Sequence, residues 1–207
     1  VCLAPQPNRG LLFDGQGGLA ATDAFDALPA AFTVEAWVRR GRTGTQEFFL
    51  GHGTNQNDQG LHLGFRADGS FTAAFYGNDV NVPTSAFGAG YDERGWNHWA
   101  VTVDGASRTV YLNGAYVGDG SGTSVAYAGR GAFTLGAGPA GLFQGEVDEV
   151  RLWTGVRTAA QIAAADDRAL TGTEAGLLAY WPLDQTEGVV APDVSKTAAH
   201  LLYAGGV

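Results

Sequence analysis

The sequence predicts an all-β protein: a two-sheet antiparallel β-sandwich of the jelly-roll type, with one short α-helix near the C-terminal third. Apolar and polar residues alternate over short segments, most clearly in 32–39, as expected of half-buried strands. Asp-Gly and Asn-Gly pairs follow several of these segments and indicate tight hairpin turns. The 207 residues include 32 glycines, and 11% are aromatic, which suits many short strands joined by turns.

The predicted strands follow one another as an antiparallel meander. Hairpin turns are expected at Asp68-Gly69, Asp104-Gly105 and Asn113-Gly114. A helix is expected from Thr158 to Ala169, because Thr158 and Gln161 have the spacing of a capping box and the run is rich in alanine. No linker divides the chain, so one domain is predicted over 1–207. The expected strands are 32–39, 61–65, 71–75, 96–103, 108–112, 115–117, 132–135, 146–153 and 177–181.

The charge of the chain excludes some classes of partner. Twelve Lys and Arg residues stand against 21 Asp and Glu residues, which gives a formal net charge of −9, and Lys196 is the only lysine. Such a chain is unsuited to nucleic acid or an anionic membrane surface, but it can bind neutral glycans, cationic partners or calcium. The single cysteine, Cys2, excludes an internal disulfide. We recognise no membrane span, signal segment, zinc motif, phosphate-binding loop or dinucleotide fingerprint.

Three carboxylates, Glu146, Asp148 and Glu149, lie within four residues and allow two interpretations. Strand alternation predicts that Glu146 and Asp148 share one face with Val150 and Leu152, whereas Glu149 lies on the other face with Arg151. Glu146 and Asp148 would then be about 7 Å apart at Cα. The working carboxyls of a retaining glycosidase are about 5.5 Å apart. The segment is therefore either an acid/base centre or a structural strand.

Four segments carry a family resemblance in the expected order: 11–15, 31–38, 95–104 with 110–114, and 145–153 with its following helix. They resemble the laminin-G-like, concanavalin-A-like lectin/glucanase domains in their bacterial and pentraxin-related branch. Residues 178–184 and 193–195 add a strand pair common beside that closing unit. The resemblance implies a two-sheet jelly roll and leaves the function open, because this fold serves many functions.

The resemblance argues against catalysis by these carboxylates. Laminarinase-type relatives carry Glu-x-Asp-x-Glu, or a version with one more residue, on a concave-face strand. Glu146 and Asp148 match the first two positions, but Val150 and Arg151 stand where the second glutamate would fall. We therefore predict no catalytic residue, and a glycoside hydrolase remains a distant alternative.

The same resemblance implies a structural calcium ion on the convex side, near the joined ends of the chain. Asp148 is the matching carboxylate, and Asp14-Gly15 in the opening strand is its expected neighbour. Oxygen ligands of this kind suit calcium. The alternative is that backbone N–H groups alone satisfy Asp148.

Two polar loops, 53–59 and 77–81, are candidates for a ligand-binding rim. Their Asn and Asp residues could bind a sugar or a second calcium ion, although these residues are also common in ordinary turns. His98 and the five tryptophans are interpreted as structural. The candidate ligand-binding residues are His52, Asn55, Asn57, Asp58, Tyr76, Asn78, Asp79 and Asn81.

The resemblance therefore implies a non-catalytic recognition module, carbohydrate-binding or adhesive, in a secreted or cell-surface protein. Its expected partner is a glycan or a surface protein, and no oligomeric state is predicted. The alternative is a structural or protein–protein interaction module, a spacer or fibre tip, without a small ligand.

Overall fold

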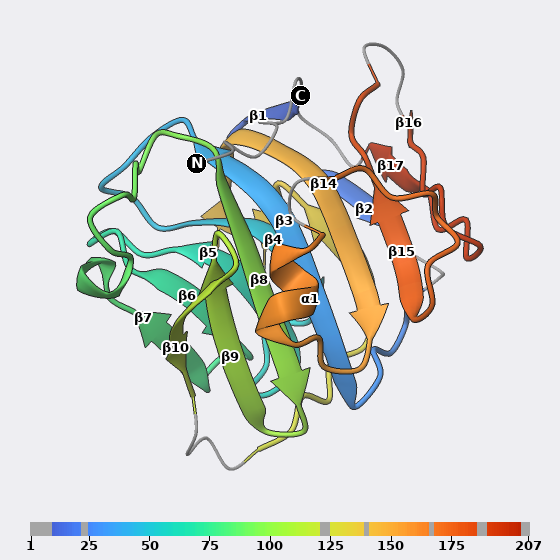
Figure 1. The fold of residues 1–207 in the computed structure, drawn as a ribbon, viewed down its shortest axis with the longest axis horizontal. Coiled ribbons are helices and arrows are strands. Elements are labelled where there is room, and N and C mark those ends of the chain that lie inside the picture. The colour runs from blue at the N-terminus through green and yellow to red at the C-terminus, as the bar shows by residue number, and fades with distance from the viewer. Residues whose placement is uncertain are drawn as a thin grey trace.

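A computed structural model describes residues 10–21, 25–120, 125–138, 141–165, 168–185 and 190–203. Within these residues two antiparallel sheets pack face to face (Figure 1). This confirms the predicted β-sandwich. The seven-stranded sheet has the order β1 (Leu11–Asp14), β14 (Gln144–Thr154), β3 (Ala31–Arg40), β8 (Asn97–Asp104), β9 (Ser107–Leu112) and β10 (Ala115–Asp119), and β15 (Leu177–Trp181) also pairs with β14.

The eight-stranded sheet forms the other layer. Its order is β16 (Val190–Ala191), β17 (Leu201–Tyr203), β2 (Leu19–Ala21), β11 (Phe133–Leu135), β4 (Glu47–Gly53), β5 (Gly60–Phe65), β6 (Phe71–Ala74) and β7 (Asp79–Val82). A small hairpin of β12 (Ala137–Gly138) and β13 (Gly141–Leu142) lies beside β4.

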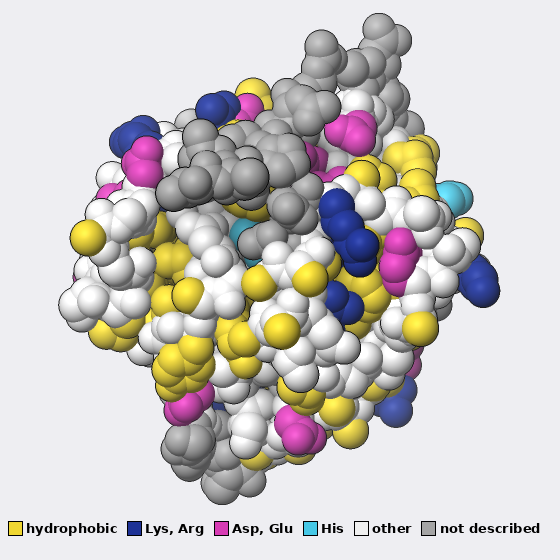
Figure 2. Space-filling model, viewed as in Figure 1, with side chains coloured by type: hydrophobic (Ala, Val, Ile, Leu, Met, Phe, Trp, Pro, Cys, Tyr) yellow, Lys and Arg dark blue, Asp and Glu magenta, His cyan; other side chains and the backbone are white. Residues whose placement is uncertain are grey.

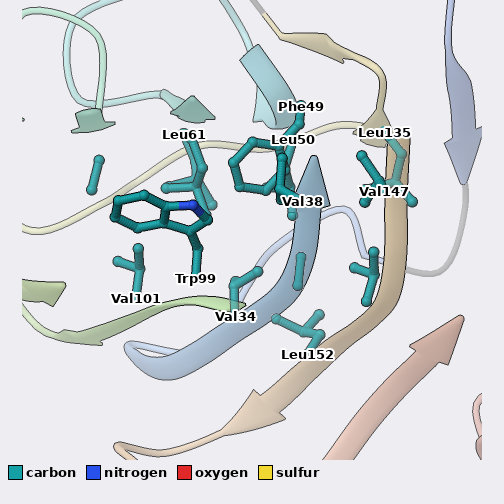
Figure 3. Packing of buried hydrophobic residues seen from close by; sticks show 14 of the residues in the cluster. Val34, Val38, Phe49, Leu50, Leu61, Trp99, Val101, Leu135, Val147 and Leu152 are labelled. Atoms are coloured by element: carbon teal, nitrogen blue, oxygen red, sulfur yellow. The ribbon is translucent and has the colours of Figure 1, made fainter. Parts of the chain in front are cut away.

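The hydrophobic core fills the space between the two sheets (Figure 3). The alternating residues of β3 point into it as predicted, including Val34 and Val38. Trp99 of β8 stacks on Phe71 of β6 with ring centroids 4.1 Å apart, so this aromatic pair joins the two layers. Large buried side chains from both sheets supply most of the stabilisation, at roughly 25 cal/mol per Å² of apolar surface.

The outer faces of the two sheets differ in character. On the seven-stranded sheet, helix α1 (Ala159–Ala163) lies over the strands, and charged residues beneath it are fully buried (Figure 1). Figure 2 shows this side, where basic side chains lie beside α1 and hydrophobic ones are exposed over β10. The outer face of the eight-stranded sheet instead presents many small residues, such as Gly51, Gly64 and Ala74.

Helix α1 is shorter than predicted. The capping box of Thr158 and Gln161 is present, but the helix ends at Ala163 instead of continuing to Ala169. The guanidinium of Arg151 donates hydrogen bonds to the carbonyls of Ala165 and Arg168, both of which lie beyond the last helical residue. A short 3₁₀ helix, η1 (Thr84–Ala86), lies in the loop before β8. No helix among the described residues has the length and hydropathy needed to cross a membrane.

A β-bulge in β14 changes which side chains share a face. The pairing of β14 with β3 shifts between Asp148 and Arg151, and Glu149 has a φ of 51°. Before the bulge Val147 points into the core, whereas after it Val150 and Leu152 do. Asp148 pairs with Trp37 and Arg151 pairs with Glu35, both outward-facing residues of β3. The prediction that Asp148 shares a face with Val150 and Leu152 is therefore wrong, because one extra residue reverses the alternation.

Candidate functional site

The two polar loops lie side by side at one end of the eight-stranded sheet. The backbone N–H of Asp58 donates to the carbonyl of Tyr76 (3.0 Å), and the side-chain amide of Asn78 donates to Oδ1 of Asp58 (2.5 Å). Asp58 and Tyr76 both have positive φ angles, 64° and 62°. Asn57 closes the contact, because a Cβ on Gly77 would lie only 2.8 Å from its Oδ1. Tyr76 and Asn78 are partly exposed, and Asn57 is exposed.

Below this rim, the outer face of the eight-stranded sheet carries a short row of polar side chains. His62 of β5 pairs with Ala74 of β6, which pairs with Asp79 of β7. Asp79 and Asn81 belong to β7, not to a loop as expected, and they point outward because Val80 and Val82 enter the core. The small Ala74 leaves the face shallow between them.

Aromatic rings border the same row. The ring of His62 meets that of Tyr76 edge-on at 6.2 Å and that of Phe48 at 4.5 Å. Nδ1 of His62 lies 2.9 Å from the carbonyl of Gly60, which makes Nδ1 the donor and leaves Nε2 as the acceptor of a neutral ring. Burial lowers the pKa of His62, so the ring is neutral at pH 7.

Arg66 lies across this face and joins several strands. Its Nη2 donates to Asp79 (2.5 Å) and Thr72 (3.5 Å), its Nη1 to Gln46 (2.8 Å), and its Nε to Asn81 (3.3 Å). Sequence reasoning did not identify Arg66, because it was interpreted only as part of the turn after β5. The one available signal was that Arg66 directly follows the predicted strand 61–65, where a side chain can still lie over the sheet.

A hollow of about 210 Å³ opens farther along the same face, lined by His52, Gly53, Ala132, Thr134, Ala137 and Gly138. Most of these side chains are small. Thr134 donates to the carbonyl of Ala137 (2.7 Å), which holds the hairpin of β12 and β13 beside the sheet. Gly51 must lack a side chain here, because a Cβ would lie 2.8 Å from Oγ1 of Thr134. The hollow has room for roughly one sugar ring, being smaller than a drug-sized pocket.

Some candidate residues do not contribute side chains to this face. His52 is buried, with Nδ1 2.5 Å from the hydroxyl of Tyr127 and Nε2 2.6 Å from the carbonyl of Phe25. It pairs with Leu61, a core residue, so the ring points inward and contacts Tyr127 and Phe25 at the edge of the hollow. Asn55 lies at the exposed tip of its loop.

The expected calcium ligands do not come together. Asp14 pairs with Gln144, four residues before Asp148 in β14, which corresponds to about 13 Å along a strand. Oδ1 of Asp14 accepts a hydrogen bond from the N–H of Gln16. One ion therefore cannot take both Asp148 and Asp14-Gly15. Within the described part of the chain, no three His, Cys, Asp or Glu side chains cluster as a metal site would require.

Asp148 is a buried carboxylate whose ionised form is poorly stabilised. It is almost fully buried, and its Oδ1 has no hydrogen-bond partner among the described residues. Burial, followed by the charges of Glu149 and Asp184, raises the pKa of Asp148 to about 8. A cation between Asp148 and Asp184 would relieve this destabilisation.

The other two carboxylates of β14 are engaged in ion pairs. Glu146 pairs with Arg39 of β3. Glu149 accepts hydrogen bonds from Arg151 (2.5 Å) and from the hydroxyl of Tyr180 (2.5 Å). These partners belong to the seven-stranded sheet, on the opposite side of the sandwich from the rim loops.

The family model described as "Concanavalin A-like lectin/glucanases superfamily" matches residues 13–163. No curated protein sequence matches the chain. Among solved structures, the fold is similar to that of a Bacteroides ovatus protein proposed to bind carbohydrate, with a TM-score of 0.68 and 20% identity. That match covers 94% of this chain and 59% of the other, so this chain spans less than two thirds of that protein.

Two further structures have the same fold. Domain 4 of a GH43 extracellular arabinanase from Geobacillus stearothermophilus, in complex with arabinotriose, has a TM-score of 0.61 at 20% identity and covers 78% of each chain. The CBM40 domain of a Ruminococcus gnavus IT-sialidase has a TM-score of 0.58 at 15% identity, over 76% of this chain and 96% of the other.

Proposed function

Because the chain belongs to the concanavalin A-like lectin/glucanases superfamily, we propose that it is a non-catalytic carbohydrate-binding module whose glycan lies on the outer face of the eight-stranded sheet. The observation that carries this proposal is the hydrogen bond between Asn78 and Asp58, which fixes two polar loops above a shallow face with a sugar-sized hollow. Pre-formed concave sites with a few polar groups are typical of ligand binding.

The groups along this face suit hydroxyl-rich ligands. The ring of Tyr76 offers an apolar surface for the face of a sugar, and its hydroxyl can donate or accept. The exposed amide of Asn57 adds donors and an acceptor in the same region. The buried ring of His62 packs edge-on against Tyr76 and supports it. Together with the hollow, these groups can hold more than one sugar unit of a chain.

The ion pairs of β14 support a non-catalytic role. Glycoside hydrolysis needs one carboxylate free to act as a nucleophile or base and a second one to act as the acid. Glu146 is paired with Arg39, and Glu149 is held by Arg151 and Tyr180. The remaining carboxylate, Asp148, is buried.

A structural calcium ion belongs to this proposal with a revised ligand set. Asp148 and Asp184 would hold it in place of the Asp148 and Asp14-Gly15 set, because Oδ1 of Asp148 is buried without a hydrogen-bond partner and the charge of Asp184 acts on it. When bound, calcium would supply charge neutralisation at the bulge of β14 and no catalytic chemistry.

We propose further that this module serves targeting or adhesion in a secreted or cell-surface protein. The arabinanase domain with the same fold is part of an extracellular enzyme and is bound to an oligosaccharide. Likeness at this level of identity supports only the fold, so the glycan ligand must be tested directly.

A glycan array in the presence of calcium, followed by calorimetry on the best ligand, tests the proposal. Tyr76→Asn removes the ring and keeps a residue that tolerates positive φ, and Ala132→Leu fills the hollow. We expect both changes to abolish most of the binding. Tyr116→Ala is the matched control, because Tyr116 is an exposed tyrosine of β10 in the other sheet.

Failure to bind any glycan would favour the alternative of a structural or protein–protein interaction module. Hydrolysis of a β-glucan that is lost in Glu146→Gln would instead overturn the non-catalytic assignment.

A further inference from the structure

We propose that this face selects neutral glycans over acidic ones, because the arginine that could bind an anionic sugar is already neutralised by Asp79. The inference rests on the proposed function and names the class of its ligand.

The guanidinium of Arg66 is occupied by the protein itself. An arginine has five N–H donors. Arg66 donates four hydrogen bonds, to Asp79, Thr72, Gln46 and Asn81. The ion pair with Asp79 is partly buried, since 27% of the Arg66 side chain and 26% of the Asp79 side chain are exposed. A sugar carboxylate would have to displace Asp79 and leave that acid unpaired.

The other basic groups near the face cannot compensate. Arg108 is fully buried, packs 4.0 Å from the ring centre of Phe75, and donates to the backbone carbonyls of Ala73 and Asn78. His62 is neutral at pH 7 because burial lowers its pKa. Neither group offers an accessible positive charge to a ligand.

Negative charge at the rim opposes an anion further. The carboxylate of Asp58 lies at the junction of the two loops, beside the partly exposed Asn78. The chain as a whole has a net charge of −9. A carboxylated sugar is negatively charged and would therefore be repelled by the carboxylates of Asp58 and Asp79 and by the net negative charge of the chain.

The comparison with a structural neighbour makes the inference specific. The R. gnavus CBM40 domain has been solved bound to α2,3-sialyllactose, an acidic sugar, and it shares 14% identity with this chain at a TM-score of 0.58. The shared fold does not determine the charge of the ligand. In this chain the negative charges of Asp79 and Asp58 outweigh the positive charge of Arg66, so the face favours the hydroxyl groups of a ligand over a carboxylate.

The test uses glycan pairs in which one member carries carboxylates and the other does not. The pairs are lactose against 3′-sialyllactose, and methyl-esterified against free oligogalacturonate. Affinities are measured by array and calorimetry for every pair in which either member binds. We expect the neutral member to bind about tenfold or more tightly, because placing like charges together is costly. We also expect its affinity to change little with added salt.

Asp79→Asn provides the decisive variant, since it keeps the shape of the side chain and leaves Arg66 without its counter-charge. We expect the preference for the neutral member to shrink or reverse. Asp119→Asn changes the net charge equally on β10 of the other sheet and should leave the preference unchanged. Thermal melting of both variants checks that they fold.

The outcomes separate the two proposals. A wild-type preference for the acidic member, or an unchanged preference in folded Asp79→Asn, would overturn this inference and leave carbohydrate binding standing. Absence of binding to every glycan on the array would overturn the proposed function, and this inference with it.

Discussion

The side-chain amide of Asn78 donates a hydrogen bond of 2.5 Å to the carboxylate of Asp58, across 20 residues of sequence. A second bond, from the N–H of Asp58 to the carbonyl of Tyr76, runs beside it. The two loops that these bonds join are otherwise largely exposed. The contact between the loops is therefore made by polar groups, so we expect it to respond to changes in charge.

Replacing Asn78 by Asp should separate the two loops. The variant would place two carboxylates in contact and remove a charge-assisted hydrogen bond, at a cost of about 1–3 kcal/mol in the free energy of unfolding. We expect glycan affinity to fall about tenfold or more. Calorimetry and urea unfolding measure the two effects.

Asn55→Asp is the control for Asn78→Asp, because it adds the same charge at the exposed tip of the neighbouring loop. Equal loss of affinity in the two variants would show that net charge, and not the bond to Asp58, determines binding.

Calcium should stabilise the protein through Asp148 and not through Asp14. We expect calcium to raise the melting temperature of the chelator-treated protein, as any ligand of the folded state does. Asp148→Asn should lose this response, because the amide supplies no charge to a hard cation. Asp14→Asn should retain it, since Asp14 lies about 13 Å away along the strand pair. An absent calcium shift in the wild type would contradict the metal site altogether.

Periodicity predicted many of the strands that face the core but not β4 or β7, whose residues Phe49, Leu50, Val80 and Val82 also enter it. The alternation of 32–39 predicted a strand and its inward face, and β3 occupies Ala31–Arg40 with Val34 and Val38 in the core. The Asn113-Gly114 pair predicted the hairpin of β9 and β10. These features depend on local sequence, which is why they could be found from it.

The site itself depends on features that local sequence does not encode. The bulge at Glu149 has a positive φ at a residue type that gives no such signal. Because of the bulge, Asp148 lies on the outer face with Arg151 instead of sharing a face with Val150 and Leu152. Arg66 follows β5 and reaches Gln46 just before β4, Thr72 of β6 and Asp79 of β7, so its partners follow from strand register. The burial of His52 likewise follows from its pairing with Leu61, which local sequence does not show.

Acid should destabilise the protein partly through His98. This residue is fully buried beside Glu35, Arg151 and Arg157, and burial followed by the two arginine charges lowers its pKa from 6.5 to about 3. Between these values the unfolded chain binds a proton that the folded protein does not. Stability therefore falls as pH decreases through this window, by up to about 1.4 kcal/mol per pH unit.

His98→Gln removes this titration and should flatten the fall in stability between pH 6.5 and pH 3, measured by urea unfolding at several pH values. Some slope should remain, because burial also lowers the pKa of His52 and His62. An unchanged slope in the variant would mean that His98 is protonated in the folded protein, paired with Glu35 at 3.6 Å.

Arg151 should contribute far more to stability than an exposed arginine in an ion pair. Its guanidinium is fully buried, bonds Glu149 and the carbonyls of Ala165 and Arg168, and lies 3.8 Å from Glu35. Lysine cannot reproduce this fork of donors, so Arg151→Lys leaves buried acceptors and charges unpaired. We expect a loss of about 3–5 kcal/mol in the free energy of unfolding.

Arg130→Lys provides the contrast to Arg151→Lys. Arg130 pairs with Asp26 at 2.7 Å, but their side chains are 70% and 66% exposed, so this change should cost less than about 1 kcal/mol. Urea unfolding of the two variants at one pH measures the difference directly. Similar losses would mean that the carbonyls after α1 find other donors when Arg151 is replaced, and that the buried guanidinium does not determine where the helix ends.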